Sequence, residues 1–233
     1  MSDQALMKHL IPTLHGGSYL AKVVAVNDPE GISRVKIRLL SFDGTDEQDA
    51  EIWARVAVPF AGNNRGAFFI PDVDDEVLVS FVNGDPRQPI VIGGLWSGSA
   101  DVPETLGGSG DSVDRWTITG KEGTRIAIEE EQPSNATIKF TTPNGVSGEL
   151  TDAGGGKIEF IIGGTTVTYD QQGVTVNTAM NVTVQAGAQV EITAAMVTVN
   201  AAMSRFNGVV QCDTLISNSV ISASYTPGAG NIW

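Results

Sequence analysis

The most constraining feature of the sequence is a short repeat of aliphatic residues in its C-terminal half. Apolar–polar–apolar triplets begin at residues 167, 174, 182, 190 and 197, so successive triplets lie seven or eight residues apart. Each triplet has the two-residue period of a strand, and turn-forming residues fill the gaps. The unit is too short for a propeller blade, a leucine-rich repeat or a helical repeat. The repeat therefore predicts a shaft of stacked short strands.

One repeat unit cannot bury a core of its own. It offers two aliphatic side chains on one face, Thr or Glu on the other, and two open backbone edges that invite pairing. Three chains wound into a triangular prism would bring the aliphatic side chains to the axis and pair the edges. A flat sheet or a short monomeric β-solenoid is the alternative. The predicted shaft core, which is also the trimer interface, consists of Val174, Val176, Val182, Val184, Val190, Ile192, Val197 and Val199.

Composition excludes several classes of partner. The chain has 233 residues and a net charge of −13, so it would repel the phosphates of nucleic acids and of anionic membranes. Beyond residue 140 the only basic residues are Lys157 and Arg205, and this shift in composition indicates two architectures in one chain. A single cysteine, Cys212, allows no intrachain disulfide. No apolar run is long enough for a transmembrane helix, and residues 1–14 lack the pattern of a secretory signal.

The N-terminal part predicts a small barrel. Strands are expected at residues 19–26, 34–39, 52–58, 76–82 and 89–92. Five short strands without a long helical period are typical of an OB-fold barrel. OB-fold barrels that bind single strands need a basic groove with exposed aromatic residues. The acidic run over residues 72–76 therefore argues against nucleic acid as a partner.

Together these patterns predict an all-β protein, an N-terminal OB-fold barrel followed by a C-terminal intertwined trimeric β-helix. The stretch between Trp96 and Trp116 is rich in Gly and Ser and too short for an enzyme domain. The expected segments are an N-terminal arm (1–17), the OB-fold domain (18–96), a linker (97–116), neck strands (117–160), a β-helix shaft (161–205) and an apex or tip segment (206–233).

Several segments of the chain resemble a known family. The segments 53–57, 66–71, 75–81 and 84–93 look like the OB domain of phage baseplate assembly protein V and of VgrG-type spikes. Residues 119–126 and 136–142 resemble the neck of that family, and residues 155–160 with the triplets resemble its intertwined shaft. The resemblance covers residues 18 to 205.

This resemblance implies a non-enzymatic, homotrimeric central spike at the baseplate of a contractile tail or injection system. Such a spike is assembled in the cytoplasm, attaches to a hub protein through its OB end, and pierces the target envelope when the sheath contracts. No cofactor, metal or catalytic residue is expected. Only about 17 residues precede the barrel, which implies a separate hub protein and favours a phage-like tail or an extracellular injection system over type VI secretion.

The C-terminal residues are expected to act at the tip of the shaft. They would either close the apex or form a platform for a small PAAR-like tip protein. The residues assigned to this role are Tyr225, Pro227, Ile232 and Trp233.

For several single residues the sequence favours a simple structural role over a catalytic or metal-binding one. His9 and His15 are expected to be ordinary residues of the arm rather than metal ligands, and residues 129–131 a solvated turn rather than a catalytic site. Cys212 lacks a neighbouring His and is expected to be inert. Two other functions stay open: a trimeric fibre or adhesin that binds surface glycans, and a spike with hydrolytic activity.

Overall fold

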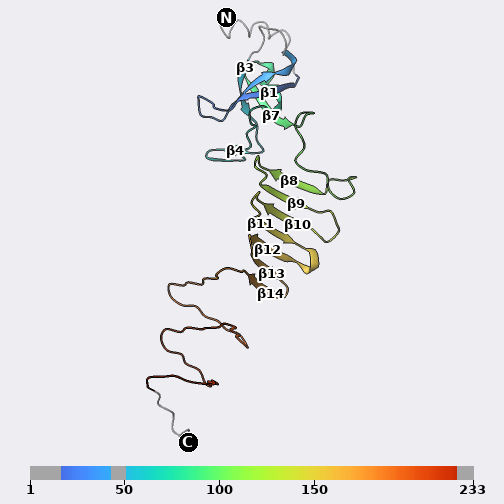
Figure 1. The fold of residues 1–233 in the computed structure, drawn as a ribbon. Coiled ribbons are helices and arrows are strands. Elements are labelled where there is room, and N and C mark those ends of the chain that lie inside the picture. The colour runs from blue at the N-terminus through green and yellow to red at the C-terminus, as the bar shows by residue number, and fades with distance from the viewer. Residues whose placement is uncertain (1–16, 43–50, 225–233) are drawn as a thin grey trace. The chain divides into compact units, whose positions relative to one another are not determined.

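The computed structural model describes residues 17–42 and 51–224 (Figure 1). Its first part is a closed barrel of five strands in the order β1-β2-β3-β7-β6. The strands β3 and β7 run parallel, and the other neighbours are antiparallel. All five predicted strands are present, which confirms the small OB-like barrel. Their bounds are β1 Tyr19–Ala25, β2 Val35–Leu39, β3 Glu51–Val56, β6 Glu76–Phe81 and β7 Pro89–Leu95.

The core of the barrel follows from strand alternation. In β2 the side chains of Val35 and Ile37 are fully buried, whereas those of Lys36 and Arg38 between and beside them are half-buried. A strand with one face in a core buries every second residue, as here. Tyr19 packs edge-on against Phe81 with 5.5 Å between ring centroids. The other fully buried core residues are Ala21, Val23, Ala54, Val77, Val79 and Val91.

The loop between β1 and β2 is organised by one carboxylate. Asp28 accepts hydrogen bonds from the backbone N–H groups of Glu30, Ile32 and Arg34 at 3.0–3.1 Å. The guanidinium of Arg34 lies 2.8 Å from Asp28 and also stacks over the ring of Trp53. The Arg34 hydrogen bonds, helped by the backbone donors, hold the pKa of the Asp28 carboxyl well below its usual value.

The barrel carries four short elements besides its five strands. They are the 3₁₀ turn η1 Leu40–Phe42, the two-residue strands β4 Ala61–Gly62 and β5 Arg65–Gly66, which pair with each other, and the 3₁₀ turn η2 Val82–Gly84.

A seven-stranded antiparallel sheet follows along the chain (Figure 1). Its strands are adjacent in space in the same order as in the sequence, from β8 to β14, so each connection is a hairpin. The bounds are β8 Arg115–Thr119, β9 Arg125–Glu129, β10 Thr137–Thr141, β11 Ser147–Thr151, β12 Lys157–Ile162, β13 Thr165–Asp170 and β14 Gly173–Asn177, with the 3₁₀ turn η3 Ala153–Gly155 before β12.

Residues 178–224 contain no assigned strand, although their sequence keeps the strand pattern. The aliphatic side chains of this segment are exposed, and Ile216 and Ile221 are 93% and 99% exposed. The predicted triplets from residue 182 onward thus find no backbone partner within these described residues. The intertwined β-helix stays a prediction. Across the parts of the chain that the structure describes, no helix is long and apolar enough to cross a membrane.

Candidate assembly surface

One face of the seven-stranded sheet is built almost entirely from apolar side chains. Strand pairing aligns them in two columns, because residues directly opposite each other point to the same side. The first column is Trp116, Ile128, Ile138, Leu150, Ile158, Tyr169 and Val174. The second is Ile118, Ile126, Phe140, Gly148, Phe160, Val167 and Val176. We call these two columns the apolar face.

The apolar face is uncovered in the single chain. Ile158 is 38% exposed and Val174 63%, and the other large apolar side chains of the two columns, apart from the half-buried Val167, lie between these values. Soluble monomers rarely expose contiguous apolar patches of more than a few hundred Å², and larger ones mark interaction sites. The apolar face is therefore a candidate surface for association with other chains.

The opposite face carries a continuous ladder of ion pairs, which we call the charge ladder. Each of its four cations lies between two carboxylates, at nitrogen–oxygen distances up to 3.8 Å. In order along the ladder, the residues are Glu131, Arg115, Glu104, Arg125, Glu129, Lys139, Glu149, Lys157 and Glu159. Thr168 continues it by donating a hydrogen bond to Glu159. This face is polar and suited to contact with solvent, so the sheet has one charged face and one apolar face.

Ionisation in the middle of the ladder is set by the neighbouring charges. Burial acts to raise the pKa of Glu129, but hydrogen bonds from Lys139 and Arg125 outweigh it and leave that pKa below its usual value. The hydrogen bond to Glu129 in turn raises the pKa of Lys139. Both groups therefore stay charged near neutral pH, and the ladder is intact there.

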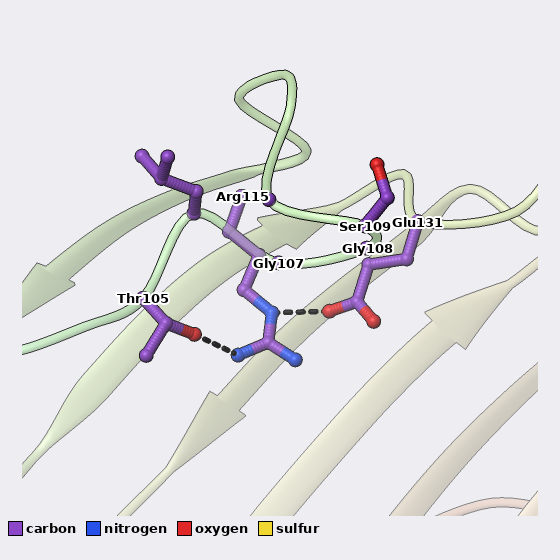
Figure 2. Close-up of a pocket in the computed structure, with 8 residues that line it drawn as sticks. Thr105, Gly107, Gly108, Ser109, Arg115 and Glu131 are labelled. Atoms are coloured by element: carbon purple, nitrogen blue, oxygen red, sulfur yellow. Dashed lines mark hydrogen bonds and ion pairs between the residues drawn. The ribbon is translucent and has the colours of Figure 1, made fainter.

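One member of the ladder comes from outside the sheet. Glu104 lies in the chain that leads from β7 to β8, and its two carboxylate oxygens accept from the guanidinium groups of Arg115 and Arg125. Figure 2 shows the guanidinium of Arg115 between the hydroxyl of Thr105 and the carboxylate of Glu131. A cavity of about 370 Å³ lies beside it, lined largely by the glycine-rich turn 107–110.

The structure places some of the predicted shaft residues on the apolar face and leaves others apart from it. Val174 and Val176 lie in β14, at the end of the two columns. The remaining six lie in residues 182–199 and are exposed there without a strand partner: Val182, Val184, Val190, Ile192, Val197 and Val199. The predicted tip residues 225–233 and the histidines at positions 9 and 15 lie outside the described residues.

The structure differs from the sequence-based expectation in two places: the prediction for residues 129–131 is wrong, and the apolar face is longer than the triplets indicate. Residues 129–131 do not form a solvated turn, because Glu129 ends β9 and is paired with Arg125 and Lys139. The apolar face also begins at Trp116, well before the triplets. The sequence signal for it is the strict alternation of apolar and polar residues within segments such as 125–129 and 157–162.

Cys212 is exposed, and among the described residues there is no cluster of three or more side chains able to hold a metal ion.

Comparison with known proteins identifies the barrel. Residues 19–96 match the family described as the type VI secretion system/phage-baseplate injector OB domain. These residues span the five barrel strands from β1 to the end of β7. The motifs in this region that resembled contractile-tail spikes are thus supported by an independent comparison.

Individual relatives agree with the family match. The type VI secretion system spike protein VgrG1a of Pseudomonas aeruginosa is 33% identical over 99 residues, which are 42% of this chain and 15% of the relative. The spike protein VgrG3 of Vibrio cholerae is 35% identical over 96 residues, 39% of this chain and 9% of the relative. The actin cross-linking toxin VgrG1 of Vibrio cholerae is 39% identical over 59 residues, 25% of this chain and 5% of the relative.

The matched part spans less than a sixth of the length of these relatives, so the comparison concerns the OB domain and its immediate surroundings. Within that part it agrees with the closed five-stranded barrel of the structure. The resemblance indicated by the sequence is confirmed for this part of the chain: residues 19–96 are an injector OB domain similar to the corresponding part of VgrG spike proteins.

Proposed function

We propose that the chain is one subunit of a non-enzymatic, homotrimeric central spike at the baseplate of a contractile tail or injection system. The observation that carries the proposal is the apolar face, which runs unbroken across all seven strands of the sheet and is exposed in the single chain. It is joined to a barrel that matches an injector OB domain. A stiff rod with a dry interior is what a piercing element requires mechanically.

The charge ladder gives the proposed trimer its orientation. Ionised groups are costly to bury without partners, whereas aliphatic and aromatic side chains gain free energy on burial. Three sheets would therefore turn the apolar face, with residues such as Ile128 and Phe160, toward a common axis. The ladder with Glu129 and Lys139 would face solvent.

The number of chains follows from the edges as well as from the faces. Two sheets packed face to face would cover the apolar face but leave the backbone edges of residues 178–224 open. Open edges are sites of further association. Three chains that exchange strands in this segment would pair those edges and bring Val182, Val190 and Val197 to the axis. In this proposal each sheet of residues 115–177 is one wall of a prism, and chain exchange begins after Asn177.

The spike role brings three expected contacts with other components. The barrel end would attach to a baseplate hub protein. The C-terminal residues 225–233 would close the apex or carry a PAAR-like tip protein. The target envelope would be met transiently during contraction, outside the cell that assembled the particle. A chain ending at Ser224 tests the tip role, because trimer stability or binding of the tip protein should then be lost.

Absolute mass in solution tests the proposal most directly. Light scattering on the full chain, without and with mild denaturant, should give three times the chain mass of 24.5 kDa and resist dissociation. A particle of two chains would contradict the prism. A stable single chain would contradict the spike and favour a monomeric β-solenoid with a binding role. Incubation with peptidoglycan should release no product, and turnover would contradict the non-enzymatic assignment.

A further inference from the structure

The segment between the barrel and the sheet is fastened to the charge-ladder face of the sheet. Glu104 places Oε1 3.0 Å from Nη1 of Arg115, and its Oε2 accepts two hydrogen bonds from Arg125, at 2.8 and 2.5 Å. The two arginines lie on adjacent strands, β8 and β9. One carboxylate thus bridges two strands. Its side chain is only 20% exposed, and those of the two arginines 27% and 21%.

The residues after Glu104 are folded rather than extended. Asp114 donates its N–H to the carbonyl of Leu106 at 2.9 Å, and its own carbonyl accepts from the N–H of Glu130, the residue that follows β9. We call residues 104–114 the strap. Its two ends are therefore held, one by Glu104 and the other by the backbone bond to the residue after β9.

Gly107 allows the strap to lie this close to the sheet, and Gly108 allows the strap to fold back on its own Asp114. Gly107 has φ +83°, and a Cβ there would stand 2.9 Å from Cγ of Arg115. Gly108 has φ +47°, and a Cβ there would stand 2.1 Å from a carboxylate oxygen of Asp114. A positive φ is accessible to glycine without strain, and the missing Cβ leaves room for the neighbouring side chains. Figure 2 shows this turn beside the Arg115 side chain.

We propose that Glu104 is a clasp that fastens the strap to the sheet and thereby limits the motion of the barrel against the sheet. The effect is on the length of free chain between the two. β7 ends at Leu95 and β8 begins at Arg115, so an unfastened connection would comprise residues 96–114. With the clasp closed, only residues 96–103 of this connection are free. The exposed ion pair of Lys121, in the β8–β9 hairpin, with Asp72 of the barrel, at 2.5 Å, joins the two parts as well.

The shortening is large enough to matter. A flexible chain of n residues has a root-mean-square span of about 5.5 Å multiplied by the square root of n. The free connection therefore spans about 16 Å when the strap is fastened and about 24 Å when it is released. The inference goes beyond the proposed spike role and holds whatever the number of chains. In a spike it would let the barrel pass an axial load to the shaft with little slack.

Hydrogen exchange on the full chain tests whether Glu104 fastens the strap. Glu104→Gln keeps the shape of the side chain but removes the charge that bridges the two arginines. Charge-assisted hydrogen bonds are stronger than neutral ones, so amides of residues 105–114 should exchange about tenfold faster. Glu122→Gln, in the exposed hairpin between β8 and β9, should leave the rate unchanged. Unchanged exchange of the strap in Glu104→Gln would overturn the clasp.

A matched variant distinguishes the effect of Glu104 from the effect of weakening the charge ladder at another carboxylate. Glu131 also pairs with Arg115 but does not belong to the strap. Glu131→Gln should leave exchange in residues 105–114 close to that of the original protein. Equal acceleration in both variants would mean that the ladder as a whole, and not Glu104, holds the strap.

Whether fastening of the strap limits the motion of the barrel needs a separate measurement. A fluorophore on Arg55→Cys, an exposed position in β3, in a Cys212→Ser background reports barrel motion through its anisotropy decay. Adding Glu104→Gln should increase the amplitude of the fast segmental component, while the urea midpoint of the sheet stays the same. Glu104→Asp should restore part of the loss.

A second variant, Gly107→Ala, tests the clasp independently in case Glu104→Gln does not fold. Gly107→Ala keeps every charge but places a methyl group against Arg115, and it should raise strap exchange and barrel motion together. A strap that exchanges faster while the barrel motion stays unchanged would overturn the coupling. Because neither readout depends on the number of chains, a failed clasp and a failed trimer would be distinguishable.

Discussion

Phe140 in β10 lies across the sheet from Gly148 in β11, and its ring covers the α-carbon of that glycine. A Cβ on Gly148 would stand 2.1 Å from the ring of Phe140. Gly148 is also paired with Phe160 of β12 on its other side. The glycine thus leaves the room in which two aromatic rings on next-nearest strands approach, with centroids 6.1 Å apart. This gap sits in the middle of the apolar face.

Gly148→Ala is expected to destabilise the sheet. The added methyl group would overlap the Phe140 ring, which would have to turn away from Phe160. Forcing extra volume into a packed site typically costs 1–3 kcal/mol, and we expect about 2 kcal/mol from urea unfolding. Gly164→Ala, in the hairpin between β12 and β13, is the control because no atom lies within 4 Å of its Cβ. Equal stability of the two variants would contradict the steric role of Gly148.

Ile128→Asp is expected to break up the proposed trimer. Ile128 stands between Trp116 and Ile138 in the first column, so each chain would bring one unpaired carboxylate to the axis. Leaving a charge unpaired in an apolar interior costs several kcal/mol. Light scattering should therefore show single chains. Thr175→Asp, on the charge-ladder face of β14, should keep the mass of the original protein, and loss of the trimer in both variants would argue against the assigned orientation.

Val182→Asp examines the segment beyond the sheet. In the proposed shaft this side chain points to the axis, so three carboxylates would come together there. Reduced resistance to dissociation in mild denaturant is the expected result, with Thr183→Asp as the matched control on the polar side of the triplet. A trimer of undiminished strength in Val182→Asp would show that residues 182–199 do not form the core.

The Asp28 carboxylate should make barrel stability depend on pH. Its pKa in the folded protein is held below the ordinary value of 3.8, mainly by Arg34, so the folded state favours the ionised form. The stabilisation is complete above that ordinary value and disappears as the pH falls toward the folded-state pKa. Asp28→Asn should therefore be less stable at pH 7 and lose less stability on acidification below pH 3.8.

Unfolding in urea at a series of pH values checks this expectation. Asp101→Asn, at an exposed position in the chain before Glu104, is the control and should follow the original protein throughout. A steep acid response that survives in Asp28→Asn would assign the effect to other carboxylates.

Much of the barrel could be predicted from the sequence because its strands are short and strongly alternating. The strand from Val35 to Leu39 illustrates this, because its apolar residues are buried and the basic residues between them are half-buried. The family motifs from Trp53 onward lie within the matched injector OB domain. The predicted strand ends differ from the observed ones by a few residues. The last barrel strand, predicted to end at residue 92, continues in β7 through Gly93 and Gly94 to Leu95.

The sequence is enough to predict that the chain is all-β, that a barrel comes first, and that a single repeat unit, such as those at Val174 and Val182, cannot bury a core of its own. These conclusions rest on local periodicity, which is visible in a linear string. It is the tertiary structure that places Trp116 and Ile138 on one face, lets Glu104 bridge Arg115 and Arg125, and requires a glycine opposite Phe140. Those relationships join residues 8 to 22 positions apart, and they arise from strand pairing and close approach, which no local pattern encodes.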